Sequence, residues 1–417
     1  MKVLLSAFDC NPLFGSDPYV GWSWVINMAK KNEVYALIRT DHKPYIEQFC
    51  SENTVEHIEN IHFIYIDSSK FWGTVVYKFN NYMAVVGAYC MWQKKAYRVA
   101  KKLHKKENFD ICHVVSIADF RFPGYLWKIP VPFIFGPVGG GQETPCCLSK
   151  YLIGHEKNEK FRTLMNKLFT MLPNYKKALN HSAVIYCSND ETQAIISKKI
   201  YPDRSKRIKH LTELGINDLY IKEREKLVKG DNDKVHILLS GRLMYRKGIQ
   251  LLIDAVRYLE TSIPYVIDIY GDGEQKKELL DIVKKYGLSE KVIFHGKVSF
   301  IEMQEKYKKA DIYCLPSLRE TTGTAVFEAM ANKLPVIALR QNGVKYIVEE
   351  DAGILVDIID EQQVVKDFSS ALKILIENHN KRISMGYRAF QKIKQQYTWN
   401  VRIENMNHIY ECLNREV

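Results

Sequence analysis

Short runs of apolar residues recur from one end of the chain to the other, and stretches with helical spacing separate them. The runs have the pattern of buried strands. Strand and helix patterns that alternate in this way predict an α/β fold with parallel sheets and crossover helices. The predicted strands lie near Lys2–Ser6, Val34–Ile38, Phe63–Ile66, Ile111–Val115, Val131–Phe135, Ala183–Cys187, Val235–Leu239, Val266–Tyr270, Val292–His295, Ile312–Leu315 and Val336–Ala338.

The two halves of the chain open in the same way. Lys2–Ser6 and Val235–Ser240 are each a buried-strand run that leads into a glycine-containing loop and then into a helical pattern. This similarity predicts two Rossmann-like domains, with a boundary near Lys206–Ile216. The pattern after Trp399 predicts a C-terminal helix. The predicted limits are 1–210 for the first domain, 211–396 for the second and 397–417 for the terminal helix.

Two glutamates with a glycine between them form the most informative motif. Glu320 follows the predicted strand Ile312–Leu315 and so lies at the carboxyl end of that strand. Gly323 and Thr324 open a helix whose first backbone N–H groups are free to bind an anion. Glu328 is four residues beyond Thr324 and therefore shares a helix face with it. Carboxylates on either side of an anion site suit a nucleoside diphosphate sugar, in which ribose and sugar hydroxyls flank a pyrophosphate.

Three further strand-to-helix turns of the second half carry compatible residues. Arg242 and Lys247 follow the strand Val235–Leu239, where two cations can neutralise a pyrophosphate. Gly271 follows the next strand and allows close approach of the backbone, and Val298 follows the strand after it. Each turn alone is a weak indication, and two isolated glutamates are more often a loop charge and a solvated helix face. Because ligands of open parallel sheets bind outside the carboxyl ends of the strands, four such turns in one register predict a single site.

With these turns, residues 235–356 resemble the retaining glycosyltransferases of glycosyltransferase family 4, which have the GT-B fold. The resemblance implies two sheets that face each other across a cleft and a C-terminal helix that crosses back to the first domain. It implies that Glu320 contacts the donor sugar, that Glu328 holds the ribose hydroxyls and that the two cations grip the diphosphate. The catalytic residues that it implies are Glu320, Arg242 and Lys247, and the donor-binding residues are Gly15, Arg242, Lys247, Gly271, Val298, Glu320, Thr322, Gly323, Thr324, Ala325 and Glu328.

The acceptor-side candidates follow strands of the first half. His113, Asp119 and Arg121 accompany the fourth predicted strand, after which members of the family place a His or Asp near the transferred sugar. Gly140 belongs to three consecutive glycines after the fifth strand, and Glu143 comes shortly after them. Consecutive glycines cost folding entropy, which indicates a requirement of the backbone there. The alternatives are a core position for the histidine and a mobile loop for the glycines.

The composition is that of a globular protein, with 417 residues of which 46% are apolar and 26% charged. The opening apolar run ends at Asp9, which argues against a signal peptide, and no run of about 18 or more apolar residues indicates a spanning helix. Nine cysteines without a Cys-x-x-Cys pair are expected to be reduced thiols of a cytoplasmic protein.

The net charge of +12 lies almost wholly in the amino half, since residues 1–209 hold 29 Lys and Arg against 18 Asp and Glu, and residues 210–417 hold 31 against 30. This asymmetry implies a partner with negative charge, such as nucleic acid, an anionic membrane or a phosphorylated acceptor. The aromatic-rich stretch Phe71 to Trp92 precedes a basic helical pattern from Lys94 to Lys106. The combination predicts contact with an anionic membrane surface, although a core helix with a solvated face fits the same pattern. Nucleic acid is disfavoured because no reader motif accompanies the charge.

Together with these observations, the resemblance implies a retaining, metal-independent glycosyltransferase in the cytoplasm, peripheral on the inner face of the membrane. It would move a sugar from a nucleotide-diphosphate sugar to a lipid-linked or polysaccharide acceptor, in the synthesis of bacterial surface polysaccharide. No cofactor is expected, because the nucleotide sugar is a substrate and no Asp-x-Asp motif stands at a donor turn. The alternatives are a nucleotide-sugar epimerase on the same fold and a non-catalytic nucleotide-sugar binding protein. Transfer needs an acceptor, epimerisation does not, and a binding protein leaves the donor unchanged.

Overall fold

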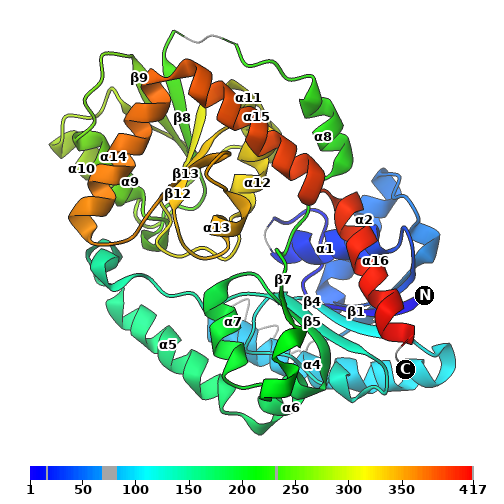
Figure 1. Cartoon of the computed structure of the whole chain (residues 1–417). Helices are drawn as coiled ribbons and strands as arrows, with labels where there is room; N and C mark the ends of the chain where they lie inside the picture. The colour runs from blue at the N-terminus through cyan, green and yellow to red at the C-terminus, as the bar shows by residue number, and fades with distance from the viewer. Residues whose placement is uncertain (16, 68–81, 231–232, 416–417) are drawn as a thin grey trace. The chain divides into compact units, whose positions relative to one another are not determined.

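The computed structural model describes residues 1–15, 17–67, 82–230 and 233–415 (Figure 1). The chain divides into two compact units. The first consists of Met1–Gly141, Met165–Leu214 and Asn400–Val417, and the second of Gln142–Leu164 and Gly215–Trp399. The chain therefore passes from one unit to the other at four places along its length.

The first unit is built on a seven-stranded parallel sheet in the order β3-β2-β1-β4-β5-β6-β7. Its strands are β1 Lys2–Ala7, β2 Glu33–Arg39, β3 Ile61–Ile66, β4 Ile111–Ser116, β5 Phe133–Val138, β6 Ser182–Cys187 and β7 Ile208–His210. Its helices are α1 Asp17–Met28, α2 Lys43–Glu52, α4 Tyr82–Glu107, α6 Pro173–His181, α7 Asp190–Ser197 and most of α16 Trp399–Arg415. Helix α5, Glu156–Thr170, begins in the second unit and ends in the first.

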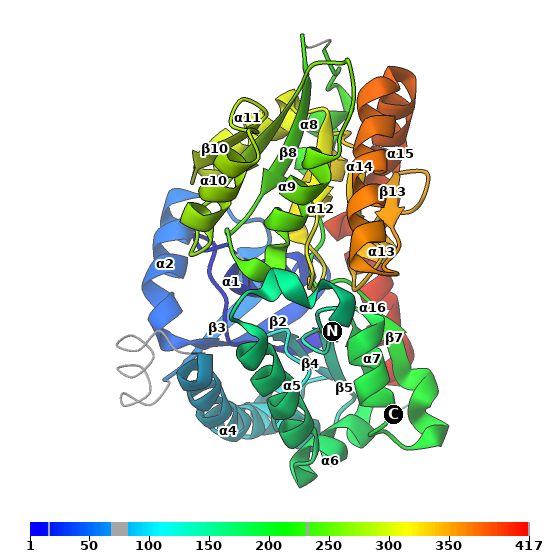
Figure 2. The same ribbon diagram turned by 90° about the vertical axis from the view of Figure 1, so that its left-hand side faces the viewer.

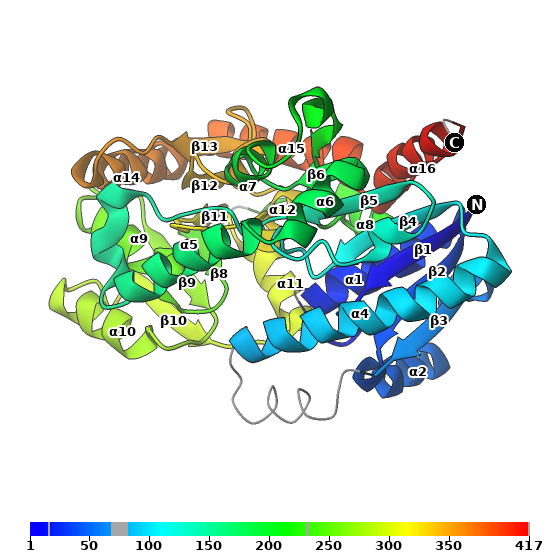
Figure 3. The same ribbon diagram turned by 90° about the horizontal axis from the view of Figure 1, so that it is seen from below.

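Both faces of this sheet are covered. Helix α4 runs along one face (Figure 3), where Tyr89 and Trp92 join the apolar cluster formed by the strands. On the other face, α16 lies beside α1 (Figure 1), and the guanidinium of Arg402 stacks 5.6 Å from the ring of Trp24. Arg402 also donates a hydrogen bond to the carbonyl oxygen of Leu214 over 2.8 Å. The C-terminal helix is thus an integral part of the first unit, through residues 400–417.

The second unit is built on a six-stranded parallel sheet in the order β10-β9-β8-β11-β12-β13. Its strands are β8 Val235–Ser240, β9 Tyr265–Tyr270, β10 Val292–Gly296, β11 Ile312–Leu315, β12 Val336–Leu339 and β13 Gly353–Val356. Its helices are α8 Asp218–Glu225, α9 Ile249–Arg257, α10 Lys276–Lys285, α11 Phe300–Lys309, α12 Thr324–Ala331, α13 Val344–Ile347, α14 Glu361–Glu377 and α15 His379–Gln396. Helices α9, α10 and α14 bury one face of the sheet, and α8, α11 and α12 bury the other. Helices α14 and α15 lie side by side (Figures 1 and 2).

The predicted strands are all present, with two differences. Strand β5 spans Phe133–Val138 rather than Val131–Phe135, because Pro130 and Pro132 have no backbone N–H to donate to the ladder. The four-residue strand β13 was not among the predicted strands, and the short strand β7 lies within the predicted boundary region Lys206–Ile216. Both lie at sheet edges, where a few residues are enough to pair with one neighbour.

The structure divides the chain differently from the predicted limits of 1–210, 211–396 and 397–417. Residues 142–164 precede β6 in the sequence but belong to the second unit. The reason is burial, since Leu148, Tyr151 and Leu152 are at most 6% exposed within the apolar cluster of that unit. The amphipathic pattern of this segment does not specify which of two cores it covers.

Two properties of the structure, the apolar character of its helices and the state of its cysteines, bear on the predicted cellular environment. Within the described ranges, no helix combines the length and the apolar character that crossing a bilayer requires. All nine cysteines lie in the described part of the chain and are free thiols.

Candidate functional site

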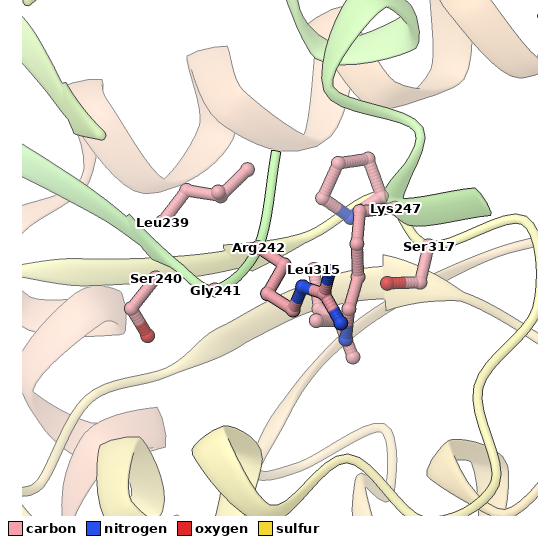
Figure 4. Close-up of a pocket in the computed structure, with 8 residues that line it drawn as sticks. Leu239, Ser240, Gly241, Arg242, Lys247, Leu315 and Ser317 are labelled. Atoms are coloured by element: carbon pink, nitrogen blue, oxygen red, sulfur yellow. The ribbon is translucent and has the colours of Figure 1, made fainter. Parts of the chain in front are cut away.

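The loops after β8 and β11 meet at one edge of the second unit, because neighbouring parallel strands end at the same edge of a sheet. They enclose a small pocket. Figure 4 shows Arg242 and Lys247 with their charged ends on the same side of this pocket, and the Ser317 hydroxyl turned toward Lys247. The residues that line the pocket are Leu239, Ser240, Gly241, Arg242, Lys247, Leu315, Pro316 and Ser317.

Lys247 forms an ion pair with Glu320, the first glutamate of the predicted motif. Both side chains are largely buried, with 18% and 13% exposed. Ser317 donates a hydrogen bond from Oγ to Glu320 over 3.3 Å. Burial by itself would raise the pKa of the Glu320 carboxyl, but the cations of Lys247 and Arg246 outweigh burial and leave this pKa below its ordinary value. Glu320 is therefore an ionised acceptor beside a cation at neutral pH.

The backbone around Glu320 is held by neighbouring loops. The Glu320 amide donates to Oδ1 of Asn342 over 3.0 Å, and the Gly343 amide donates to the carbonyl oxygen of Thr321 over 3.0 Å. From the β8 side, Arg246 donates to the carbonyl oxygen of Arg319 over 3.4 Å. These bonds connect the Glu320 loop to the turns after β8 and β12, so its position depends on both.

Helix α12 begins as the motif predicts. Gly323 precedes it with φ of 78°, in the left-handed region that favours glycine. A Cβ atom there would lie 3.3 Å from the side chains of Leu315 and Val326, so a larger residue would also crowd the turn. Thr322 is buried, whereas Thr324 is exposed in the first turn of the helix and is followed by Ala325. The first N–H groups of a helix have no partner within the helix and can bind an anion, although that of Val326 donates to the carbonyl oxygen of Gly323 over 2.8 Å.

Glu328 lies one turn further along α12. Burial raises the pKa of its carboxyl to about 7, and a hydrogen bond from the hydroxyl of Tyr307 lowers it by a smaller amount. Tyr307 also lies 2.9 Å from the hydroxyl of Ser240, at the end of β8. Glu328 therefore belongs to the same edge of the sheet as the pocket, but its environment favours the protonated form much more than that of Glu320.

Gly271 and Val298 have structural surroundings of their own. Gly271 has φ of 143°, and a Cβ atom there would lie 1.8 Å from the carbonyl oxygen of Gly241. The close approach predicted for Gly271 is thus an approach to the loop after β8, and a side chain at this position would push the two loops apart. Val298 is partly buried and packs against the apolar cluster on the α11 and α12 side of the sheet.

The structure brings some of the predicted residues of the first half together, since a Cβ atom on Gly140 would lie 3.7 Å from Oδ1 of Asp119. Gly15 lies in an exposed part of the loop between β1 and α1, where a Cβ atom would have no atom of the described residues within 4 Å. Asp119 and Arg121 form a largely buried ion pair with each other. Gly140, with φ of 102°, packs against the ring of Phe120.

His113 lies in the core of the first unit. It is fully buried, with Nδ1 2.6 Å from the hydroxyl of Tyr410 and Nε2 2.5 Å from the carbonyl oxygen of Gly136. Burial lowers the pKa of its imidazole to about 4, so the ring is neutral and both nitrogens are engaged. This arrangement corresponds to the core alternative, and His113 fastens α16 to β4 instead of facing solvent.

Glu143 lies on the other side of the unit boundary from Gly140. It is exposed in the second unit, where Thr163 donates a hydrogen bond to its carboxylate over 3.0 Å. The predicted acceptor-side residues are therefore not gathered within one unit. They stay candidates for contact with an acceptor.

Several residues that shape the site were absent from the predicted set. Ser317 and Arg319 stand beside Glu320 in the sequence, and their proximity was a usable signal. Tyr307 and Asn342 come from other elements, so only the folded sheet brings them to Glu328 and Glu320.

Residues 221–392 match the family Glycosyl transferases group 1. This range contains β8 to β13 together with the loops that form the pocket. Residues 221–392 of the second unit are therefore similar to this family, and the predicted resemblance to glycosyltransferases is confirmed. Assignment to family 4 stays a prediction.

Individual relatives agree with this assignment. Sulfoquinovosyl transferase SQD2 of Arabidopsis thaliana is 28% identical over 177 residues, which are 42% of this chain and 33% of that protein. An uncharacterized glycosyltransferase of Methanocaldococcus jannaschii is 23% identical over 320 residues, 76% of this chain and 80% of that protein. This chain thus spans about a third of the plant relative's length and most of the archaeal one.

A solved structure extends the similarity to the whole chain. HepE of Anabaena, in complex with UDP, has a TM-score of 0.63 at 14% identity and covers 99% of this chain and 100% of its own. Together with the two parallel sheets, this similarity confirms the predicted GT-B fold with two Rossmann-like units.

Proposed function

We propose that this protein is a retaining glycosyltransferase of family 4 that takes its sugar from a nucleotide-diphosphate sugar. The observation that carries the proposal is the pocket at the ends of β8 and β11, which Arg242 and Lys247 line and where Lys247 pairs with the ionised carboxylate of Glu320. Two cations suit a diphosphate, and a carboxylate suits sugar hydroxyls. HepE of Anabaena has been solved with UDP and with UDP-glucose, which supports uridine as the base.

In the proposed reaction, the bond between the anomeric carbon and the diphosphate oxygen breaks. The acceptor oxygen bonds to the same carbon from the same face, and the acceptor proton passes to the departing diphosphate. Charge grows on the diphosphate as the bond breaks, so Arg242, Lys247 and the first-turn N–H groups of α12 stabilise the transition state more than the bound donor. Glu320 holds the sugar hydroxyls during this step. Metal independence is part of the proposal.

The test measures the thermal unfolding of the protein in the presence of each member of a panel of nucleoside diphosphates and their sugars. A ligand at about 100 times its dissociation constant should stabilise the folded protein by roughly 2.7 kcal/mol. We expect UDP and a UDP-sugar to raise the melting temperature, with and without a chelator. Donor consumption that begins only when an acceptor is added would support transfer over epimerisation. A panel in which no nucleotide shifts the melting temperature would contradict the proposal.

We further propose that the acceptor is lipid-linked or a polysaccharide, in bacterial surface polysaccharide synthesis, and that the protein works from the cytoplasm on the inner face of the membrane. Support comes from the basic side of α4, where Lys94, Arg98, Lys101 and Lys102 are exposed. The aromatic residues that the sequence predicted at this surface do not all contribute to it. Tyr89 and Trp92 are buried in the core, and residues 71–81 lie outside the described ranges.

Exposed apolar side chains are present on another helix. Phe161, Leu164 and Leu168 of α5 are 54%, 52% and 48% exposed, and their spacing of three and four residues places them on one side of that helix. Lys157 and Lys160 are exposed on the same helix. Apolar residues with lysines nearby suit the interface of an anionic bilayer.

Replacing Lys94, Lys95, Lys101 and Lys102 by Glu should therefore abolish co-sedimentation with anionic liposomes. Each Lys near such a surface contributes about 1 kcal/mol, screened by salt over roughly 10 Å at 0.1 M. Binding of the parent protein should fall steeply as salt rises. A matched control replaces Lys276, Lys277, Lys284 and Lys285 of α10 by Glu, and it should sediment like the parent. If the α4 variant still sediments with the liposomes, its lysines only form a solvated helix face and do not bind the membrane.

A further inference from the structure

The segment Gln142–Leu164 is a part of the second unit that the first half of the sequence supplies. Its 3-10 turn, Cys146–Leu152, is anchored in the core of that unit through Leu148, Tyr151 and Leu152. Tyr151 donates a hydrogen bond to Oδ2 of Asp254 on α9 over 3.0 Å. The segment is therefore fixed to the sheet that carries the pocket.

The segment touches the turn that carries Lys247. The ring of His155 packs 4.2 Å from the ring of Tyr245, two residues before Lys247. Leu148 also belongs to the same apolar cluster as Leu243, which follows Arg242 directly. One side of the segment thus lies against the loop after β8.

The segment also touches both neighbours of Glu320. Oε1 of Glu159 lies 2.9 Å from Nη2 of Arg319, and the two side chains are only 20% and 17% exposed. The side-chain amide of Gln142 donates a hydrogen bond to the hydroxyl of Thr321 over 2.8 Å. Two separate contacts from one segment therefore hold the residues on either side of the glutamate.

Charge explains why Glu159 is needed there. Burial, together with the positive charges of Arg162 and Arg246, lowers the pKa of Arg319 to about 10. A buried cation among like charges is costly unless a carboxylate compensates it. Glu159 supplies that carboxylate and lies 3.6 Å from Arg162 as well. Without it, Arg319 would be driven toward solvent, and the backbone that carries Glu320 would move with it.

We propose that the segment Gln142–Leu164 positions the donor-binding loops and that Glu159 is a positioning residue for Glu320, acting through Arg319. This inference rests on the proposed function, because it treats those loops as the site of the nucleotide diphosphate. The donor site would then be completed by a segment outside the matched family range of 221–392. Glu159 has no part in the chemical step.

The test measures the affinity of the full chain for UDP by calorimetry in two variants of Glu159. Glu159→Gln keeps the length of the side chain and removes its charge, whereas Glu159→Asp keeps the charge and is one methylene shorter. If Glu159 acts by position, both variants should bind UDP about tenfold more weakly. Glu156→Gln, which removes an exposed charge one turn earlier on α5, is the matched control and should bind like the parent.

Two further variants separate positioning from a general loss of structure. Glu159→Gln combined with Arg319→Gln should bind UDP no more weakly than Arg319→Gln alone, because the two side chains act as one pair. Gln142→Ala removes the bond to Thr321 and should weaken UDP binding with little change in the melting temperature of the free protein. Additive losses in the double variant, together with unchanged affinity in Gln142→Ala, would overturn the inference.

The remaining outcomes distinguish this inference from the proposed function. If Glu159 were only a negative charge near the diphosphate, Glu159→Gln would bind UDP more tightly and Glu159→Asp would bind like the parent, and the positioning role would be wrong. If the parent binds UDP and the Glu159 variants bind it with the same affinity, the positioning role alone would be overturned. A parent that binds no nucleoside diphosphate would overturn both.

Discussion

Replacing Arg242 by Ala should weaken UDP binding tenfold or more and leave the melting temperature of the ligand-free protein almost unchanged. Arg242 is exposed at the pocket, and no residue of the described ranges forms an ion pair with it. Its guanidinium is therefore available to a diphosphate, and a hydrogen bond to a charged group contributes about 1.5–3 kcal/mol. Such a loss corresponds to roughly ten- to hundredfold in the dissociation constant, which calorimetry measures directly.

Lys247→Ala should behave differently, because Lys247 is also the partner of Glu320. Removing one member of a buried ion pair costs about 3–5 kcal/mol, so both UDP affinity and stability should fall. Adding Glu320→Gln should restore much of the stability but not the affinity. Lys276→Ala is the control, since that lysine forms a surface ion pair with Asp272 away from Glu320. Unchanged UDP affinity in both Arg242→Ala and Lys247→Ala would contradict the assignment of the diphosphate to this pocket.

Glu328→Gln should stabilise the protein at pH 8 and have little effect at pH 4, with a difference of up to about 3 kcal/mol in the free energy of unfolding. The pKa of the Glu328 carboxyl is about 7 in the folded protein, against an ordinary value of 4.5. Between these values the folded state holds a proton that the unfolded state has released, so stability falls as pH rises through this window. Glutamine removes that dependence. Urea unfolding at several pH values measures the difference, and parallel curves for parent and variant would contradict the raised pKa.

Nucleotide binding should be coupled to the loss of the proton from the Glu328 carboxyl. A carboxylate accepts hydrogen bonds from ribose hydroxyls best when it is ionised. UDP binding by the parent should therefore release a proton from Glu328 near pH 6, and Glu328→Gln should release less. Calorimetry in two buffers of different ionisation enthalpy detects the release. Glu320→Gln is the matched control, because the lowered pKa of Glu320 keeps its carboxyl ionised throughout this range.

The arrangement of the pocket could be predicted because a parallel sheet converts sequence order into spatial order. Once Val235–Leu239 and Ile312–Leu315 are recognised as parallel strands of one sheet, the residues that follow them must lie at the same edge. Arg242 and Lys247 line the pocket there, and Lys247 pairs with Glu320. Gly323 was predictable for a local reason as well, since the turn before α12 requires a positive φ.

Other expectations depended on surroundings that no local pattern reveals. His113 follows the pattern of a strand-end residue, but its ring nitrogens are both bonded within the core. Tyr89 and Trp92 precede a basic helical stretch in the sequence, yet they face the sheet rather than the solvent. In each case the residue type and spacing fit two environments equally well, and only packing against distant elements distinguishes them.

The sequence by itself determined the parallel α/β architecture, the positions of most strands and the residues at the ends of β8, β9, β10 and β11. These properties follow from periodicity and turn chemistry, which act over a few residues. The tertiary structure decided that Lys247 pairs with Glu320, that the pKa of Glu328 is raised, and that residues 142–164 belong to the second unit. Ion pairing, desolvation and the choice between two apolar cores depend on groups that are far apart in the chain, so they are defined only once the folded units bring those groups together.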